Sequence, residues 1–128
     1  MSQVATTTES TLKTIDIFSH EIKTIYTAQR HFEAPNWSRD GGFFIVNSLG
    51  KIYTIPADGS GMKLLNSDFA DECNNDHGIS PDGKWLAFGV SQDDFLNPEM
   101  LPALVNLDSC QVAPLNSLNG EMRFWLQP

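Results

Sequence analysis

The chain has 128 residues, with 16 acidic and 8 basic side chains and a formal net charge of −8 at pH 7. This acidic balance argues against binding to nucleic acid or to an anionic membrane surface, because both need clustered Lys and Arg. The sequence also lacks the run of about 18 apolar residues that a transmembrane helix needs. The length is that of one domain.

The first ten residues are polar and rich in Thr, which predicts a disordered lead-in. They lack the basic start and apolar core of a secretory signal. We therefore expect a cytoplasmic protein, or a periplasmic one if this N-terminus is not the native one. Cys73 and Cys110 stand apart without a CxxC spacing, so we expect mostly buried thiols and neither a disulfide nor a metal site.

Strands account for most of the remaining chain. Residues 12–17 and 22–26 alternate apolar and polar side chains around a turn at 18–21, which predicts a hairpin. The later strands follow one order: a short strand, an Asp-Gly turn, an apolar strand and two alternating strands. In the first unit these strands are residues 32–37, 43–46, 51–55 and 62–65, and in the second they are 76–80, 85–88, 103–107 and 111–115.

The order is a sequence repeat. Ser38-Arg39-Asp40-Gly41 recurs 42 residues later as Ser80-Pro81-Asp82-Gly83, and each copy precedes an apolar run. Such a period, with short strands and Asp-Gly turns, is typical of β-propeller blades. The segment from Glu121 aligns with the segment from Glu33, so a further unit begins with a strand at 122–125.

The predicted fold is all-β, built from antiparallel four-stranded blades of a six-bladed β-propeller. After the lead-in, the units are residues 12–29, 30–71 and 72–117, and the next starts at 118–128. A propeller needs four to eight blades, whereas this chain holds about two and fragments. We therefore expect incomplete blades, with Phe43, Ile45, Trp85 and Phe88 partly exposed at open faces, and self-association that completes the propeller.

These residues resemble a known family. The pattern from Trp37 to Val46 (WSRDGGFFIV) and that from His77 to Phe88 (HGISPDGKWLAF) are similar to the TolB-like propeller proteins, whose WD40-like or PD40-type repeats build a six-bladed propeller. The resemblance runs from Leu12 to Leu115. Because the same repeats also build propellers of oligogalacturonate lyases and of prolyl oligopeptidase-like peptidases, the resemblance implies a fold and leaves the function open.

The densest polar cluster precedes the predicted inner strand of the second unit and contains Asn74, Asn75, Asp76 and His77. Such residues lie at one mouth of a propeller channel, where they can bind a ligand or hold the backbone of the next blade. Glu33 and Glu121 occupy equivalent positions in successive inner strands. They point to the channel in a closed ring, or they are exposed charges at strand ends.

Motifs for other chemistry are missing from the sequence. It has no GxSxG nucleophile elbow, no GxxxxGK[ST] phosphate loop and no HxxxH or CxxC metal spacing. His20 and His31 lie in or near turns, and we expect neither to have a partner. We expect Trp37, Trp85 and Trp125 to pack between blades.

The predicted function is a non-catalytic propeller module for a protein or small polar ligand, with no cofactor, no metal, no nucleic acid and no membrane insertion. The alternative is a fragment of a propeller enzyme, either an oligogalacturonate lyase or the gating propeller of a prolyl oligopeptidase-like peptidase. The missing motifs weigh against catalysis. They do not decide it.

Overall fold

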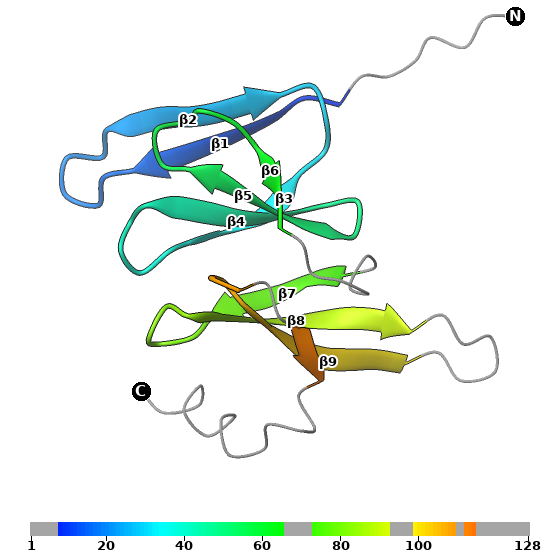
Figure 1. Ribbon diagram of the computed structural model, residues 1–128. Helices are drawn as coiled ribbons and strands as arrows, with labels where there is room; N and C mark the ends of the chain where they lie inside the picture. The colour runs from blue at the N-terminus through cyan, green and yellow to red at the C-terminus, as the bar shows by residue number, and fades with distance from the viewer. Residues whose placement is uncertain (1–7, 66–72, 93–98, 110–111, 115–128) are drawn as a thin grey trace, which may run out of the picture.

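The computed structural model describes residues 8–65, 73–92, 99–109 and 112–114. These residues form ten strands and no helix, arranged as three antiparallel sheets that stack in layers (Figure 1). The strands are β1 (Ser10–Ile15), β2 (Ile22–Ala28), β3 (Glu33–Trp37), β4 (Phe43–Ser48), β5 (Lys51–Pro56), β6 (Lys63–Leu64), β7 (Cys73–Ile79), β8 (Trp85–Gln92), β9 (Glu99–Asn106) and β10 (Val112–Pro114).

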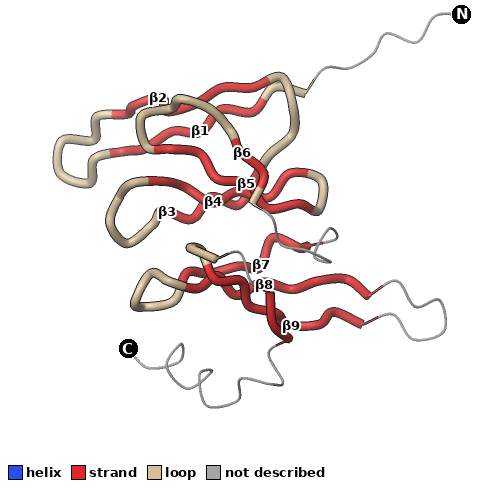
Figure 2. Tube along the Cα trace, in the orientation of Figure 1, coloured by secondary structure: helices blue, strands red, loops and turns tan. Residues whose placement is uncertain are grey.

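The sheet topology is that of consecutive meanders, with short loops between most described strands (Figure 2). One sheet holds β1 and β2, the next runs β3-β4-β5-β6, and the third runs β7-β8-β9-β10. Each strand of the four-stranded sheets pairs antiparallel with the strand that follows it in the chain. The all-β, antiparallel, four-stranded units predicted from the repeat are confirmed.

The spacing from Ser38 to Phe43, which both repeats share, has a direct structural cause in the β3–β4 turn. The Ser38 hydroxyl donates to an Asp40 carboxylate oxygen at 2.7 Å and accepts from the backbone N–H of Phe43 at 3.0 Å. The same Asp40 oxygen accepts from the N–H of Gly42 at 2.9 Å. Gly41 takes the left-handed φ of +77° that this turn requires.

The β7–β8 turn repeats these bonds. Ser80 donates to Asp82 at 2.5 Å and accepts from the N–H of Trp85 at 3.0 Å. Asp82 accepts from the N–H of Lys84 at 2.9 Å, and Gly83 has φ +76°. The repeat in the sequence is therefore a repeat of one hydrogen-bonded turn. After this turn the apolar strand runs antiparallel to the strand before it.

Two apolar layers lie between the three sheets. Phe44 and Val46 of β4 face β1–β2, while Ile45 faces β7–β10. Alternation along β4 therefore buries both of its faces, as expected for an apolar second strand. The first layer contains Leu12, Phe32, Phe44, Val46 and Ile55, and the second contains Ile45, Ile52, Leu65, Cys73, Ile79, Leu86, Phe88 and Val105.

The placement of several apolar residues corrects the sequence analysis. Ile45 is 0% and Phe88 3% exposed, so the prediction that they lie at an open face is wrong. The stacked neighbour sheet covers them. Trp37, predicted between blades, is 53% exposed and stacks one face on Phe44, with ring centroids 4.8 Å apart. Trp85 is half-buried, and Trp125 lies outside the described residues.

Candidate functional site

The predicted polar cluster lies within β7, because this strand begins at Cys73, earlier than its apolar residues suggested. The register of β7 against β8 shifts between Cys73 and His77, so an irregularity falls within the cluster. β7 contacts β3, the first strand of the neighbouring sheet. Residues from β3 and β7 therefore meet at one edge of the stacked sheets.

Only part of the predicted set can be placed there. Asn75 is exposed and His77 is half-buried. The side chains of Asn74 and Asp76 fall outside what the structure describes, and Glu121 lies outside the described residues altogether.

Glu33 and Asn75 come together across two sheets. A side-chain hydrogen bond from Asn75 is the main reason that the pKa of Glu33 lies below its usual value, and a side-chain hydrogen bond from His31 adds to this. His31 Nε2 lies 3.3 Å from Glu33 Oε1, with both side chains nearly half exposed. The prediction that His31 has no partner is wrong, because its ring contacts the carboxylate of Glu33, two residues further along the chain.

Asn36 makes the second contact between β3 and β7, and the sequence analysis missed it. Its side-chain Nδ2 donates to the backbone carbonyl of His77 at 3.0 Å and lies 2.7 Å from Nδ1 of the same residue. An amide nitrogen can only donate, so Nδ1 accepts and the ring proton lies on Nε2. The signal that could have identified Asn36 is its polar side chain on the half-buried face of a short inner strand.

Two further bonds attach β7 to the sheet beside it. The Asn47 side chain donates to the carbonyl of Cys73 at 2.9 Å, and the N–H of Cys73 donates to the carbonyl of Gly50 at 2.7 Å. With the Asn36 bond, these contacts hold the backbone of β7. Among the described residues, side chains of β3 and β4 therefore bond the β7 backbone.

Among the described side chains of the site, Glu33, Asn75 and His31 form an exposed patch of one carboxylate, one amide and one imidazole. Such a set can bind a ligand that presents hydrogen-bond donors or a positive charge. The described residues contain no group of three or more His, Cys, Asp and Glu that could hold a metal ion. They also contain no helix long and apolar enough to cross a bilayer.

Stacked four-stranded antiparallel meanders, each with an apolar second strand, are blades of a β-propeller. Comparison with solved structures gives the particular type. A candidate TolB from Agrobacterium tumefaciens superposes with a TM-score of 0.66 at 22% identity, covering 87% of this chain and 55% of that one. TolB from Acinetobacter baumannii gives 0.63 at 23% identity, covering 82% of this chain and 26% of that one. The tricorn protease superposes with a TM-score of 0.61 at 14% identity, covering 81% of this chain and 10% of that one.

The chain therefore has the fold of TolB-like β-propellers, and the resemblance drawn from the repeats is confirmed at the level of the fold. No family model matches it. An uncharacterised protein of Agrobacterium fabrum is 39% identical over 79 residues, which are 61% of this chain and 27% of that protein. The chain thus spans about a quarter of this curated relative and about half of the Agrobacterium tumefaciens structure.

Proposed function

We propose that the chain is a non-catalytic, TolB-like propeller module that binds a protein or a small polar ligand through Glu33, Asn75 and His31. The observation that carries this proposal is the exposed Glu33–Asn75 contact across two sheets. Hydrogen bonds favour the ionised form of Glu33, as its lowered pKa indicates. A carboxylate held in this way suits an ammonium or guanidinium group.

The charge of the whole chain supports a basic ligand or partner. A formal net charge of −8 draws cationic molecules toward the surface and repels anionic ones. No observation on the described residues favours the alternative, a fragment of a propeller lyase or peptidase. The likeness to the tricorn protease, at 14% identity, is a likeness of fold.

A thermal-shift screen with small amines, guanidinium compounds and basic dipeptides tests the proposal. A hit should raise the melting temperature of the wild-type protein by mass action. Asn75→Ala should keep the wild-type melt, because Asn75 is exposed, and should lose the ligand-induced shift. Hits that shift Asn75→Ala as much as wild type, or a complete lack of hits, would contradict the proposal.

Asn36→Ala is the matched control at this edge. It removes the amide that donates to the His77 carbonyl, so it should lower the free energy of unfolding by about 1–3 kcal/mol. If Asn75→Ala destabilises the protein as much as Asn36→Ala does, Asn75 is a structural residue and the binding role assigned to it is wrong.

The compartment is also a proposal. A periplasmic location, the alternative left by the sequence, fits the likeness to TolB proteins. Fractionation of cells that express the chain from its native gene tests this: a periplasmic location should release the protein with the osmotic-shock fraction. Retention with the cytoplasmic fraction would contradict it.

A further inference from the structure

The β4–β5 turn holds a leucine in a backbone conformation that does not suit it. Ser48 pairs with Lys51, so Leu49 and Gly50 are the two central residues of a tight hairpin turn. Their φ angles are +52° and +85°, and positive values at both positions define a type I′ turn. Asn, Asp and Gly are the usual residues at the first position, because bulky L side chains are disfavoured there. The turn itself therefore gives no reason for a leucine.

Burial gives no reason for this leucine either. The Leu49 side chain is 79% exposed and belongs to neither apolar layer. The other two described non-glycine residues with positive φ are His20 and Ala34, and neither is a large apolar residue. A bulky apolar side chain that strains its backbone and buries nothing within the chain points to contact with another molecule.

Hydrogen bonds on both sides of Gly50 hold the turn in place. The N–H of Gly50 donates to Oδ1 of Asn47 at 3.0 Å, and its carbonyl accepts from the N–H of Cys73 at 2.7 Å. The turn is therefore attached to its own strand and to β7 of the neighbouring sheet. A side chain presented from a turn held in this way loses little conformational freedom on binding.

The turn adjoins the patch of Glu33, Asn75 and His31. The Ser48 hydroxyl donates to the backbone carbonyl of His31 at 2.6 Å. Glu33 pairs with Asn47, two residues before Leu49. Since paired residues are about 5 Å apart and successive residues of a strand about 3.3 Å, the backbones of Glu33 and Leu49 are separated by about 8 Å.

Opposite charges flank the leucine. Glu33 lies on β3 and the exposed Lys51 on β5, with β4 between these two strands. The other nearby cation, Arg30, already has partners: its guanidinium donates to the Ser48 hydroxyl at 3.0 Å and lies 4.6 Å from the centre of the Tyr53 ring. Across the three strands the surface therefore presents a carboxylate, an apolar side chain and an ammonium group, in this order.

We propose that this surface binds a peptide segment that presents a basic, an apolar and an acidic side chain in order, with the apolar side chain against Leu49. The proposal rests on the proposed function, whose Glu33 patch would pair with the basic side chain, and it specifies the class of partner. Side chains two residues apart in an extended peptide lie on the same face, about 7 Å apart, which matches the separation of Glu33 and Leu49. The charged pairs set the direction of the peptide, and the apolar contact supplies most of the affinity.

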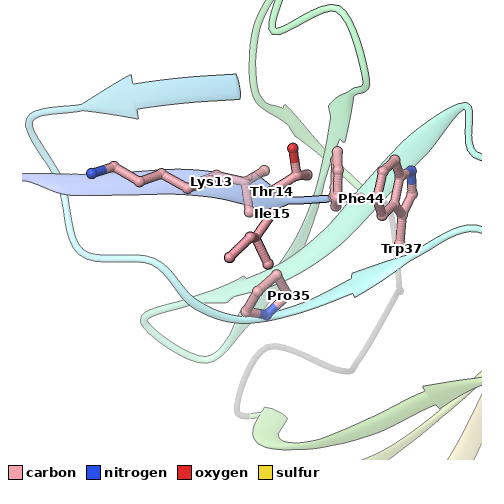
Figure 3. Close-up of a pocket in the computed structure, with 7 residues that line it drawn as sticks. Lys13, Thr14, Ile15, Pro35, Trp37 and Phe44 are labelled. Atoms are coloured by element: carbon pink, nitrogen blue, oxygen red, sulfur yellow. The ribbon is translucent and has the colours of Figure 1, made fainter. Parts of the chain in front are cut away.

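A second apolar feature provides the control site. The β4–β5 turn lies at the end of its sheet opposite to the β3–β4 turn (Figure 1). A hollow of about 240 Å³ between β1 and the next sheet is lined by Ile15, Pro35 and Trp37, among others, and Ile15 points toward Pro35 (Figure 3). An apolar peptide side chain that binds without regard to the flanking charges would enter this hollow. Ile15→Ser, at a position that is 56% exposed, removes its apolar contact.

The probe is the synthetic peptide acetyl-Arg-Ser-Leu-Ser-Glu-amide, and the matched peptide has Ser in place of Leu. Calorimetric titration of the full chain should give at least about tenfold tighter binding of the leucine peptide. Leu49→Asn should bind both peptides equally, and its melting temperature should match or exceed that of the wild type, because Asn suits this turn position. Ile15→Ser should keep the tenfold preference.

Two further variants test the charges. Glu33→Gln and Lys51→Gln should each weaken both peptides by about two- to fivefold, the range of an exposed ion pair, and should keep the preference for leucine. Unchanged binding in both variants would overturn the assigned order of side chains.

The proposal is also overturned if the wild type does not prefer the leucine peptide, if Leu49→Asn keeps the preference, or if Ile15→Ser loses it. A lower melting temperature of Leu49→Asn overturns it as well, because the leucine then stabilises the fold. A wild-type dimer that Leu49→Asn dissociates would show that a second copy occupies the turn, with the same consequence.

Asn75→Ala distinguishes failure here from failure of the proposed patch. If Leu49→Asn keeps the preference while Asn75→Ala loses the binding of small amines, the patch stands and the role of the turn is wrong. If Leu49→Asn loses the preference while Asn75→Ala behaves as wild type, the contact at Leu49 is supported and the role of Asn75 in the patch is wrong.

Discussion

Gly59 and Gly83 adopt nearly the same backbone conformation in different surroundings. Their φ angles are +75° and +76°, in the left-handed region that L side chains disfavour. A Cβ on Gly59 would stand 2.0 Å from the carbonyl oxygen of Ile25. A Cβ on Gly83 would meet nothing closer than the side chain of Arg39, at 3.5 Å. Comparing an alanine at each position therefore separates the cost of a left-handed backbone from the cost of a clash with neighbouring backbone.

Gly83→Ala should lower the free energy of unfolding by about 1 kcal/mol, the cost of a left-handed alanine. Gly59→Ala should cost at least twice as much, because the backbone of β2 must also move away. Urea denaturation of both variants and the wild type measures the difference. Equal losses would show that the turn after β5 shifts without resistance and that its approach to Ile25 does not stabilise the fold.

The sequence analysis missed two contacts at the candidate site for different physical reasons. Asn36 has its partner, His77, across a sheet–sheet contact, whereas His31 contacts Glu33, two residues further along the chain. The partner of Asn36 depends on how the two sheets approach one another, which neither local periodicity nor residue spacing encodes. Glu33, in contrast, was a candidate from its place in an inner strand and Asn75 from the polar cluster before the next one, although their direct contact was not predicted.

At the scale of elements, the two Ser-x-Asp-Gly turns present carboxylates with lowered pKa values. The pKa of Asp40 is lowered first by the N–H of Gly42 and then by the hydroxyl of Ser38. For Asp82 the hydroxyl of Ser80 is the largest cause, followed by the N–H of Lys84. All these hydrogen bonds favour the ionised carboxylates, so the stability of both turns depends on pH.

Because their pKa values are lower in the folded than in the unfolded chain, both carboxylates contribute stability that is fully present above their usual pKa of 3.8. That contribution is lost as the pH falls through the folded values. The free energy of unfolding should therefore fall on acidification below about pH 4. In an Asp40→Asn, Asp82→Asn double variant, urea melts across this range should show a shallower dependence. An unchanged slope would assign acid sensitivity to other groups.

The elements themselves were predictable because their signals are local. Alternation identified β1, β2 and β5, and the Asp-Gly turns identified the starts of β4 and β8. The start of β7 was not predicted, because Cys73 to His77 carries no apolar alternation. The exposure of Trp37 was also missed, because it depends on which strands lie beside the β1–β2 hairpin.

At the scale of the whole molecule, exposed apolar side chains gather around the β1–β2 hairpin. Ile17 and Phe18 at its turn are 76% and 88% exposed, while Ile15, Ile22 and Trp37 are more than half exposed. Two of the four residues expected at open faces, Ile45 and Phe88, are covered instead by the stacking of the two larger sheets, whereas Phe43 and Trp85 are half-buried. In the part of the chain that the structure describes, exposed apolar surface is therefore concentrated at the hairpin end of the stack (Figure 1).

We expect copies of the chain to self-associate in solution through this hairpin end, because contiguous exposed apolar surface favours association in water. Light scattering over a concentration series should give a particle heavier than one chain, with three copies as the assembly that supplies six four-stranded units. An Ile17→Ser, Phe18→Ser double variant should shift the particle toward a single chain and keep the melting temperature, since both side chains are exposed and lie outside the apolar layers. A monodisperse wild-type monomer with a cooperative melt would show that the hairpin end is stable in water without a partner.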